Sequence, residues 1–134
     1  MTADELAETL GMQPHPEGGR YVETWRGPDA GGRATATAIY FLLVAGERSH
    51  WHRIDADEVW LFHAGDPLSI EVAASAGAEV VRHVLGSSIA DGARPQVVVP
   101  AGAWQSATPL GDWTLVSCVV APGFEFEGFE LAPD

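Results

Sequence analysis

The stretch from Gly46 to Gly65 reads G-E-R-S-H-W-H-R-I-D-A-D-E-V-W-L-F-H-A-G and carries the most informative pattern in the chain. His50, His52 and the carboxylate of Glu58 lie on segments of this stretch that read as β-strands. Histidine and carboxylate side chains this close on a rigid β scaffold can bind a metal ion or share a proton. The stretch therefore predicts a chemically active site, and the rest of the sequence is needed to distinguish metal binding from proton transfer.

Around this stretch the sequence predicts a β-rich chain with one helix. The helix spans Thr2 to Leu10, where Thr2 and Glu5 form a capping box and Gly11 ends the last turn. Prolines and paired glycines in residues 13–19 indicate irregular structure. Beyond them, runs of β-forming residues alternate with turn signals, which predicts a sandwich or barrel of roughly nine to eleven strands. The expected strands are Arg20–Arg26, Ala34–Val44, Ser49–Ile54, Glu58–Ala64, Pro67–Ala73, Glu79–Leu85, Val97–Val99, Trp104–Thr108, Asp112–Ala121 and Phe124–Leu131.

Length and composition indicate one domain over residues 1–134. The hydrophobic content of 46% fits a globular protein. No apolar run reaches the ~18 residues of a membrane helix, and no secretory signal is visible. The one cysteine, Cys118, cannot form an internal disulfide, and its apolar strand predicts a small buried side chain. We therefore expect a cytoplasmic protein.

The charge and composition of the chain argue against several classes of partner and cofactor. A net charge of −12 argues against nucleic acid and against anionic membranes, because both need a basic surface. All seven basic residues are arginines, so no lysine can form a Schiff base with pyridoxal phosphate. Neither a phosphate loop nor a Rossmann glycine pattern is present. The expected partner is a small molecule, with no cofactor.

The spacing within the opening stretch resembles the first motif of the cupins, G-X5-H-X-H-X3,4-E-X6-G. Gly46, His52, Glu58 and Gly65 match this motif in register, while Ile54 stands at the second metal-binding histidine. His50 lies outside the ligand register.

The second cupin motif, G-X5-P-X-G-X2-H-X3-N, is matched in part. Pro100 and Gly102 are kept, but Gln105 stands in place of the last metal-binding histidine. Arg94 replaces the opening glycine and Pro109 the closing asparagine. Of four ligand positions, only those of His52 and Glu58 keep a common metal ligand, so the sequence predicts no tightly bound metal.

Four longer strings extend the resemblance over nearly the whole chain. They are P-H-P-E-G-G-R-Y-V-E-T-W-R, H-R-I-D-A-D-E-V-W-L-F-H-A-G-D-P-L, V-P-A-G-A-W-Q and V-A-P-G-F-E-F-E-G-F-E-L. They resemble the DUF985 (cupin_5) subfamily, which is described as cupin-like with a predicted sugar-epimerase label. The resemblance implies an all-β fold, a double-stranded β-helix or jelly-roll barrel, with one short N-terminal helix.

The leading hypothesis is a metal-independent epimerase or isomerase that acts on a sugar-like or other small polar metabolite. The resemblance to metal-free sugar epimerases of the cupin superfamily implies His52 as base, Glu58 as its carboxylate partner, and Tyr21 or Tyr40 as acid. One alternative is a cupin that binds a metabolite without chemistry. Another is a metal-dependent cupin of the dioxygenase or lyase type.

Further residues are expected to bind the ligand. Trp60 and Phe62 share the strand face of Glu58, where they either line the pocket or fill the core. Tyr21, Glu23 and Trp25 share a face of their strand, which predicts pocket lining with Glu23 as an acceptor. The alternatives are an exposed face or a pairing of Glu23 with one of the arginines. The proposed ligand-binding set is Tyr21, Glu23, Tyr40, Trp60, Phe62 and Gln105.

The remaining aromatic and histidine residues are assigned other roles. His15, His63 and His83 are interpreted as surface or structural residues. Trp51, Trp104 and Trp113 hint at an outer-sheet contact, and a homodimer is expected because symmetric dimers are the commonest oligomers.

Overall fold

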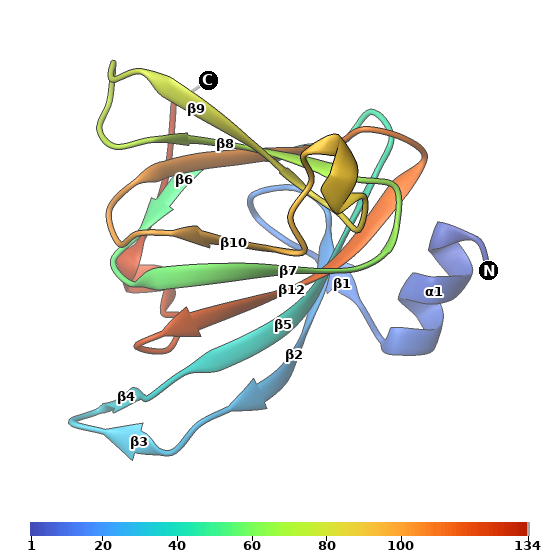
Figure 1. Ribbon diagram of the computed structural model, residues 1–134. Helices are drawn as coiled ribbons and strands as arrows, with labels where there is room; N and C mark the ends of the chain where they lie inside the picture. Colours follow the sequence, from blue (N-terminus) through green and yellow to red (C-terminus); the bar gives the residue numbers. More distant parts are fainter. Residues whose placement is uncertain (134) are drawn as a thin grey trace.

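The computed structural model describes residues 1–133, and they form two facing antiparallel β-sheets (Figure 1). The six-stranded sheet has the order β1-β2-β5-β12-β7-β10, and the five-stranded sheet the order β13-β6-β11-β8-β9. Successive strands from β5 onward mostly alternate between the sheets, which makes the fold a double-stranded β-helix, or jelly roll.

The strands of the six-stranded sheet are β1 (Gln13–Pro14), β2 (Arg20–Arg26), β5 (Thr37–Val44), β7 (Asp57–Gly65), β10 (Gln96–Val99) and β12 (Trp113–Ala121). Those of the five-stranded sheet are β6 (Ser49–Ile54), β8 (Leu68–Ala73), β9 (Val80–Leu85), β11 (Trp104–Pro109) and β13 (Phe129–Leu131). A small hairpin pairs β3 (Asp29–Ala30) with β4 (Arg33–Ala34), and the 3-10 turns are η1 (Ile89–Asp91) and η2 (Phe126–Gly128).

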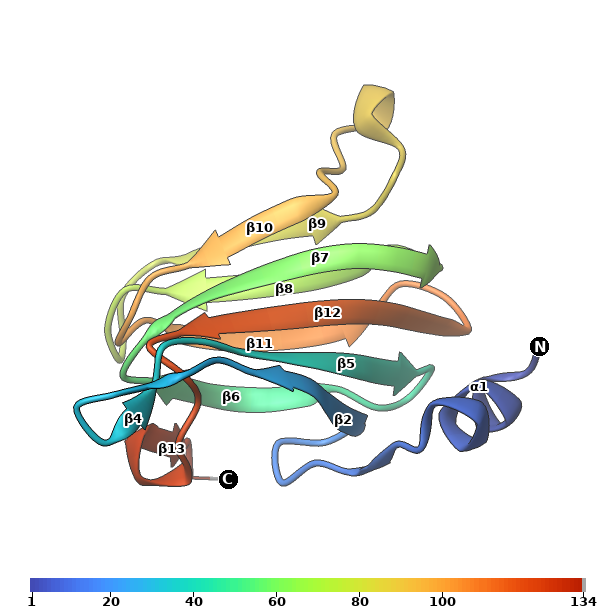
Figure 2. The same cartoon turned by 90° about the horizontal axis from the view of Figure 1, so that it is seen from below.

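The helix α1 (Ala3–Leu10) begins and ends as the sequence predicts. Thr2 and Glu5 exchange the two hydrogen bonds of a capping box, and Gly11 closes the helix in the left-handed conformation. Figure 2 shows α1 beside the strands rather than across either sheet. The described helices are all too short to cross a lipid bilayer.

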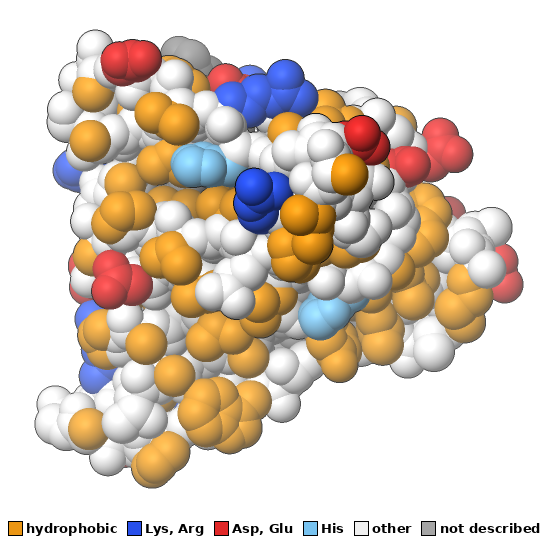
Figure 3. Space-filling model, in the orientation of Figure 1, with side chains coloured by type: hydrophobic (Ala, Val, Ile, Leu, Met, Phe, Trp, Pro, Cys, Tyr) orange, Lys and Arg blue, Asp and Glu red, His pale blue; other side chains and the backbone are white. Residues whose placement is uncertain are grey.

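The hydrophobic core fills the space between the two sheets. Phe41, Trp60 and Val116 enter it from the six-stranded sheet, and Leu68 and Ile70 from the five-stranded sheet; each is at most 1% exposed. On the outer face in Figure 3, hydrophobic, acidic and basic side chains are interspersed.

The structure corrects the predicted end of the chain. The expected strand Phe124–Leu131 is mostly a loop with the turn η2, and only Phe129–Leu131 pairs with β6. The turn forms because the Phe124 amide donates to the Thr37 hydroxyl, and the Gly128 amide donates to the Glu125 carbonyl.

The segment expected to be irregular is also partly ordered. Gln13 and Pro14 form β1 and pair with Tyr21 and Arg20 of β2.

Candidate functional site

A cavity of about 110 Å³ lies beside the core, between the two sheets. Its acidic, basic and thiol-bearing lining residues are His15, Glu17, Glu23, Arg26, His52, Glu58 and Cys118. Its remaining lining residues are Tyr21, Thr37, Ile39, Ile54, Val120, Phe124 and Phe126. Five strands and two loops contribute these side chains, so the cavity exists only in the folded barrel.

The geometry of His52 leaves one ring nitrogen available for chemistry. His52 lies on β6 and is 2% exposed. Its Nδ1 is 2.8 Å from the backbone carbonyl of His50, which can only accept, so Nδ1 carries the proton. Burial lowers the pKa of His52, and the Glu58 carboxylate and the His50 carbonyl offset part of this effect. The ring is therefore neutral near pH 7, with a lone pair on Nε2.

Glu17 faces that lone pair, although it lies in a segment that the sequence analysis assigned no function. Its Oε2 is 3.6 Å from His52 Nε2 and accepts a hydrogen bond from the Ser49 hydroxyl. Burial raises the pKa of Glu17 to about 8, and the Ser49 hydrogen bond lowers it only in part. Glu17 is consequently protonated at neutral pH, and the cavity holds a carboxylic acid beside an imidazole base.

Two glycines bring the loop with Glu17 between the strands. Gly18 and Gly19 have φ values of 109° and 75°, which residues with a Cβ rarely adopt. A Cβ at Gly18 would meet the Arg48 carbonyl, and one at Gly19 would meet the Leu42 carbonyl at 2.8 Å. Because both sites lack a Cβ, the loop packs closely enough for the Glu17 carbonyl to accept from the His50 amide at 2.6 Å.

His15 supports the same loop from inside. Its Nδ1 accepts from the Glu17 amide at 3.1 Å and lies 3.4 Å from Glu17 Oε1. Its ring meets those of Tyr21 and Phe41 edge-on, with centroids 4.6 and 5.8 Å apart. Burial, with a smaller effect of His52, lowers the pKa of His15 to about 4. Of the two roles expected for His15, the structure therefore supports the structural one, in the cavity wall rather than at the surface.

Glu58 ends a chain of buried hydrogen bonds. The Trp60 indole donates to Gln105 Oε1 at 2.9 Å, and Gln105 Nε2 donates to Glu58 Oε1 at 2.8 Å. Because an indole can only donate, it fixes the orientation of the Gln105 amide. Burial and the neighbouring Glu17 raise the pKa of Glu58 to about 7, against weaker opposing contributions from His52, Gln105 and the Cys118 thiol.

Only some of the residues expected to be catalytic or to bind the ligand line the cavity. Tyr21, Glu23, His52 and Glu58 line the cavity. Trp60 fills the core at 1% exposure, Phe62 packs against that core, and Gln105 lies behind Glu58 at 0% exposure. These three do not line the cavity.

Tyr40 does not line it either. Its ring lies edge-on to His63, which contacts the Ser117 hydroxyl on the outer side of the six-stranded sheet.

A bulge in β2 places Arg26 at the cavity, where regular alternation would have placed Trp25. The pairing of β2 with β5 shifts between Glu23 and Trp25, so strict alternation fails at Thr24. Trp25 is 51% exposed, whereas Arg26 pairs with Thr37 and reaches the cavity. There its guanidinium forms an ion pair with Glu23 at 2.8 Å.

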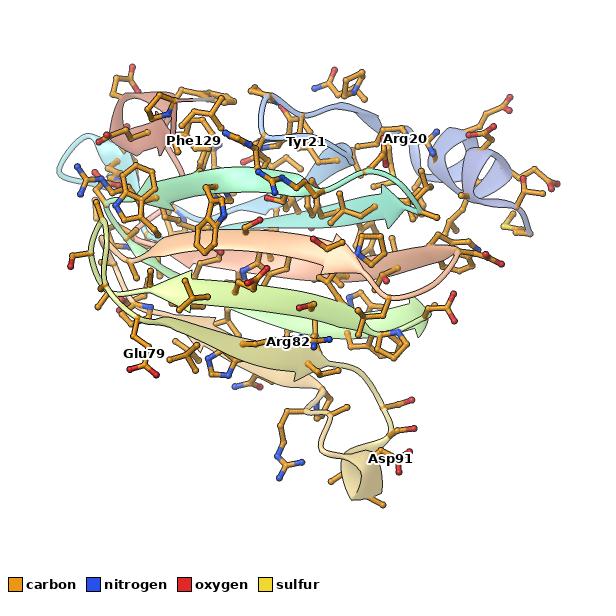
Figure 4. All side chains as sticks on the ribbon, turned by 90° about the horizontal axis from the view of Figure 1, so that it is seen from above. Arg20, Tyr21, Glu79, Arg82, Asp91 and Phe129 are labelled. Carbon is orange, nitrogen blue, oxygen red and sulfur yellow. The ribbon has the colours of Figure 1, made fainter. Side chains whose placement is uncertain are left out.

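Aromatic residues from the two ends of the chain form one wall of the site. Phe124 and Phe126 line the cavity, with ring centroids 4.9 Å apart and each 6.4 Å from that of His15. Figure 4 shows Tyr21 and Phe129 along the same edge of the barrel, and both rings neighbour His15. Sequence reasoning missed this wall because its residues meet only through the loop around η2.

The donor set does not fit the metal site that the cupin fold implies. Ile54 lines the cavity at a ligand position, and Gln105 uses its oxygen to accept from Trp60. His50 contacts Arg48 and the Ala132 carbonyl instead of the cavity. Within residues 1–133, no three His, Cys, Asp or Glu side chains are grouped so that they could hold a metal ion.

The fold and the site together define a cupin. A sequence profile described as "Cupin superfamily (DUF985)" matches residues 4–132, and the chain belongs to this family. A search of curated proteins finds no significant match.

Two solved structures with the same fold are close in sequence. A structural-genomics protein from Shewanella oneidensis is 41% identical, with a TM-score of 0.93 over 98% of this chain and 85% of that one. A hypothetical protein from Leishmania major is 33% identical, with a TM-score of 0.89 over 98% and 88% of the two chains.

More distant cupins share the fold alone. The capsular polysaccharide assembling protein CapF from Staphylococcus aureus is 16% identical, with a TM-score of 0.68. The match covers 92% of this chain and 34% of CapF.

Proposed function

We propose that this cupin is a metal-independent isomerase or epimerase that moves a proton on a small polar metabolite. The observation that carries the proposal is the 3.6 Å approach of His52 Nε2 to the Glu17 carboxyl group inside the cavity. A neutral base and a neutral acid, whose ordinary pKa values would make both charged near pH 5, are held here in their reactive forms.

The geometry supports a proton transfer beside a carbonyl group. His52 Nε2 removes a proton from the carbon next to the carbonyl, while the Glu17 hydroxyl hydrogen-bonds the carbonyl oxygen and stabilises the enolate. Glu58, when ionised, stabilises the imidazolium that forms. The imidazolium then returns the proton to the same carbon, or to the former carbonyl carbon. In the second case the Glu17 carboxyl group gives its proton to the carbonyl oxygen and takes one from the hydroxyl group on the first carbon, so no proton is gained or lost.

The position of the acid refines the sequence-based mechanism. Tyr40 does not line the cavity, and the Tyr21 hydroxyl accepts a hydrogen bond from Gln13 at 3.4 Å. Glu17 lies next to the base and therefore replaces a tyrosine as the leading acid. Acid and base on one side of the substrate favour isomerisation, since inversion of a carbon centre would need a second donor on the opposite side.

Deuterium exchange tests this function across a whole class of candidate substrates. Small aldoses and ketoses incubated with the protein in D₂O should lose the NMR signal of the proton next to the carbonyl. His52→Gln should abolish this exchange, because glutamine has no basic nitrogen. Exchange that continues unchanged in His52→Gln would reject the mechanism. Binding of a sugar without exchange in the wild-type protein would select a metabolite-binding role.

We also propose that the protein is cytoplasmic and that two copies of it pair through the outer face of the five-stranded sheet. Trp51 and Trp104 line an apolar groove there with Ala73 and Val80, and Arg53 lies 4.9 Å from the Trp104 ring. Trp113 lies elsewhere, against Gly65.

A further inference from the structure

Among the described lining residues, no arginine is free to balance the charge of Glu58 when it ionises. Glu17 and Glu58 are buried, and Glu23 lies nearer the mouth. The hydrogen-bond donors to the two buried carboxyl groups are neutral: the Ser49 hydroxyl for Glu17 and the Gln105 amide for Glu58. Arg26, the one arginine in the lining among the described residues, forms an ion pair with Glu23.

The imidazoles do not supply the missing positive charge. His15 Nδ1 accepts from the Glu17 amide, and burial disfavours the cationic form of both His15 and His52. His52 Nε2 lies in the cavity wall with Glu17 Oε2 as its neighbour at 3.6 Å, beyond hydrogen-bond distance. This nitrogen borders the cavity and can accept a hydrogen bond from a ligand that has donors to offer.

Aromatic rings surround the same space. Tyr21, Phe124 and Phe126 line the cavity from β2 and from the loop before β13. The faces of such rings carry negative potential and attract cations within about 6 Å. Carboxyl groups beside aromatic rings form a surrounding that suits an ammonium group far better than an anion.

We propose that the ligand of this site carries a protonated amine, as an amino sugar or a small amino alcohol does. The ammonium group donates hydrogen bonds to Glu17 and Glu58, its carbon atoms pack against Phe124 and Phe126, and hydroxyl groups meet Glu23 and Arg26 at the mouth. This inference rests on the proposed function, because it names the substrate class of the same cavity.

The cavity size and the charge balance agree with this class. A volume of about 110 Å³ admits an amine head group of a few heavy atoms while the rest of the ligand lies toward the mouth. Mutual repulsion of Glu17 and Glu58 contributes to the raised pKa of Glu58. A bound cation would favour the ionised form of Glu58, which burial otherwise disfavours, while Glu17 keeps the proton that the reaction needs.

A matched pair of probes tests the amine directly. Ethanolamine and ethylene glycol differ in one ammonium for one hydroxyl group, and both fit a small cavity. Their dissociation constants are measured by protein-observed NMR titration at pH 7. Ethanolamine should bind about tenfold more tightly or better, since a hydrogen bond to a charged group is worth ~1.5–3 kcal/mol. Equal binding of the two probes overturns the proposal.

Three variants test whether the ammonium group binds in the cavity. Glu58→Gln should weaken ethanolamine binding and leave ethylene glycol binding unchanged. Phe126→Ala should weaken ethanolamine binding more than ethylene glycol binding, because the two probes share their carbon atoms and only the ammonium group is attracted by the ring face; Phe126 is 52% exposed, so its loss should disturb the fold little. Glu79→Gln removes a carboxylate from an exposed residue just before β9 that does not line the cavity and lies across the sheets from Tyr21 and Phe129 in Figure 4, so it should change neither constant. A loss in Glu79→Gln equal to that in Glu58→Gln would show non-specific attraction and overturn the proposal.

The two proposals fail in different ways. If ethanolamine and ethylene glycol bind equally and His52→Gln still abolishes deuterium exchange, the amine is wrong and the proton transfer stands. If ethanolamine is preferred and no sugar or amino sugar exchanges deuterium, the site binds amines without the proposed reaction.

Discussion

At the scale of single residues, the protonation states in the cavity are set by burial rather than by ion pairs. His52 and Glu58 could be predicted from motif spacing, because the strands that carry them are regular and the motif fixes their register. Glu17 and His15 could not, since nothing in P-H-P-E-G-G indicates that the loop folds inward. Their partners, Ser49 and Tyr21, are far enough along the chain that only tertiary packing brings them together.

The buried proton on Glu17 makes the stability of the protein depend on pH. Below its ordinary pKa of 4.5, Glu17 is protonated in both the folded and the unfolded chain. As the pH rises, the unfolded chain loses this proton while the folded protein keeps it up to about 8, so the free energy of unfolding falls throughout this window. Glu58 adds to the fall up to a pH of about 7. The low pKa of His15, about 4, has the opposite effect, but only below its ordinary value of 6.5.

Glu17→Gln should remove most of the slope between about pH 7 and 8, where one proton contributes up to about 1.4 kcal/mol per pH unit. Urea unfolding at several pH values measures the free energy of unfolding. Glu79→Gln serves as the control and should keep the wild-type slope. A slope in Glu17→Gln as steep as that of the wild type would show that Glu17 is ionised in the folded protein.

At the scale of elements, irregularities decide which side chains reach the site. Period-two alternation predicts that Trp25 shares the cavity face of β2 with Tyr21 and Glu23. The bulge at Thr24 instead brings Arg26 to this face. Bulges leave no reliable mark in a sequence, because they depend on how the neighbouring strand pairs. For the same reason the strand propensity of Phe124–Leu131 did not reveal the turn that directs Phe124 and Phe126 into the cavity.

The glycine pair before β2 provides a test of how the loop forms the site. Gly18→Ala should destabilise the protein and displace Glu17, since the new Cβ combines an unfavourable φ with a clash against the Arg48 carbonyl. Gly77→Ala is the matched control: it also has positive φ, 78°, but nothing lies within 4 Å of its Cβ. It should cost only the conformational strain of ~1–2 kcal/mol.

Urea unfolding compares the two variants, and Gly18→Ala should lose at least about 1 kcal/mol more because of the overpacking. It should also lose the preference for ethanolamine, while Gly77→Ala keeps it. Equal losses of stability in both variants would mean that the loop does not need its close approach to β6.

At the scale of the whole molecule, the jelly roll was the most predictable property. The resemblance of two motifs and four long strings to cupins implies it, whereas the hydrophobic pattern alone predicts only a sandwich or barrel. The site was less predictable, because its lining comes from five strands and two loops whose relative positions no spacing argument provides. Of the residues expected to bind ligand, those on β2 line the cavity, whereas Trp60 and Gln105 support it from behind.

The outer groove of the five-stranded sheet provides the test of pairing. Light scattering coupled to size exclusion should give twice the mass of one chain. Trp51→Glu should give a single chain, because a carboxylate in the apolar groove has no partner there. Trp25→Glu adds the same charge on the other sheet and should remain paired. A wild-type protein of single mass, or pairing that survives Trp51→Glu, would contradict this interface.

The hydrogen-bonded chain from Trp60 through Gln105 to Glu58 also gives the protein a built-in optical signal. Trp60 is 1% exposed, whereas the other four tryptophans all lie partly or largely in contact with solvent. Its indole therefore emits at the blue end of the fluorescence spectrum, apart from the rest. A proton or ligand that changes the charge on Glu58 also changes the electrostatic surroundings of the indole, because only the Gln105 amide lies between them. We therefore expect binding at the site to shift the wavelength of Trp60 fluorescence in the unlabelled protein.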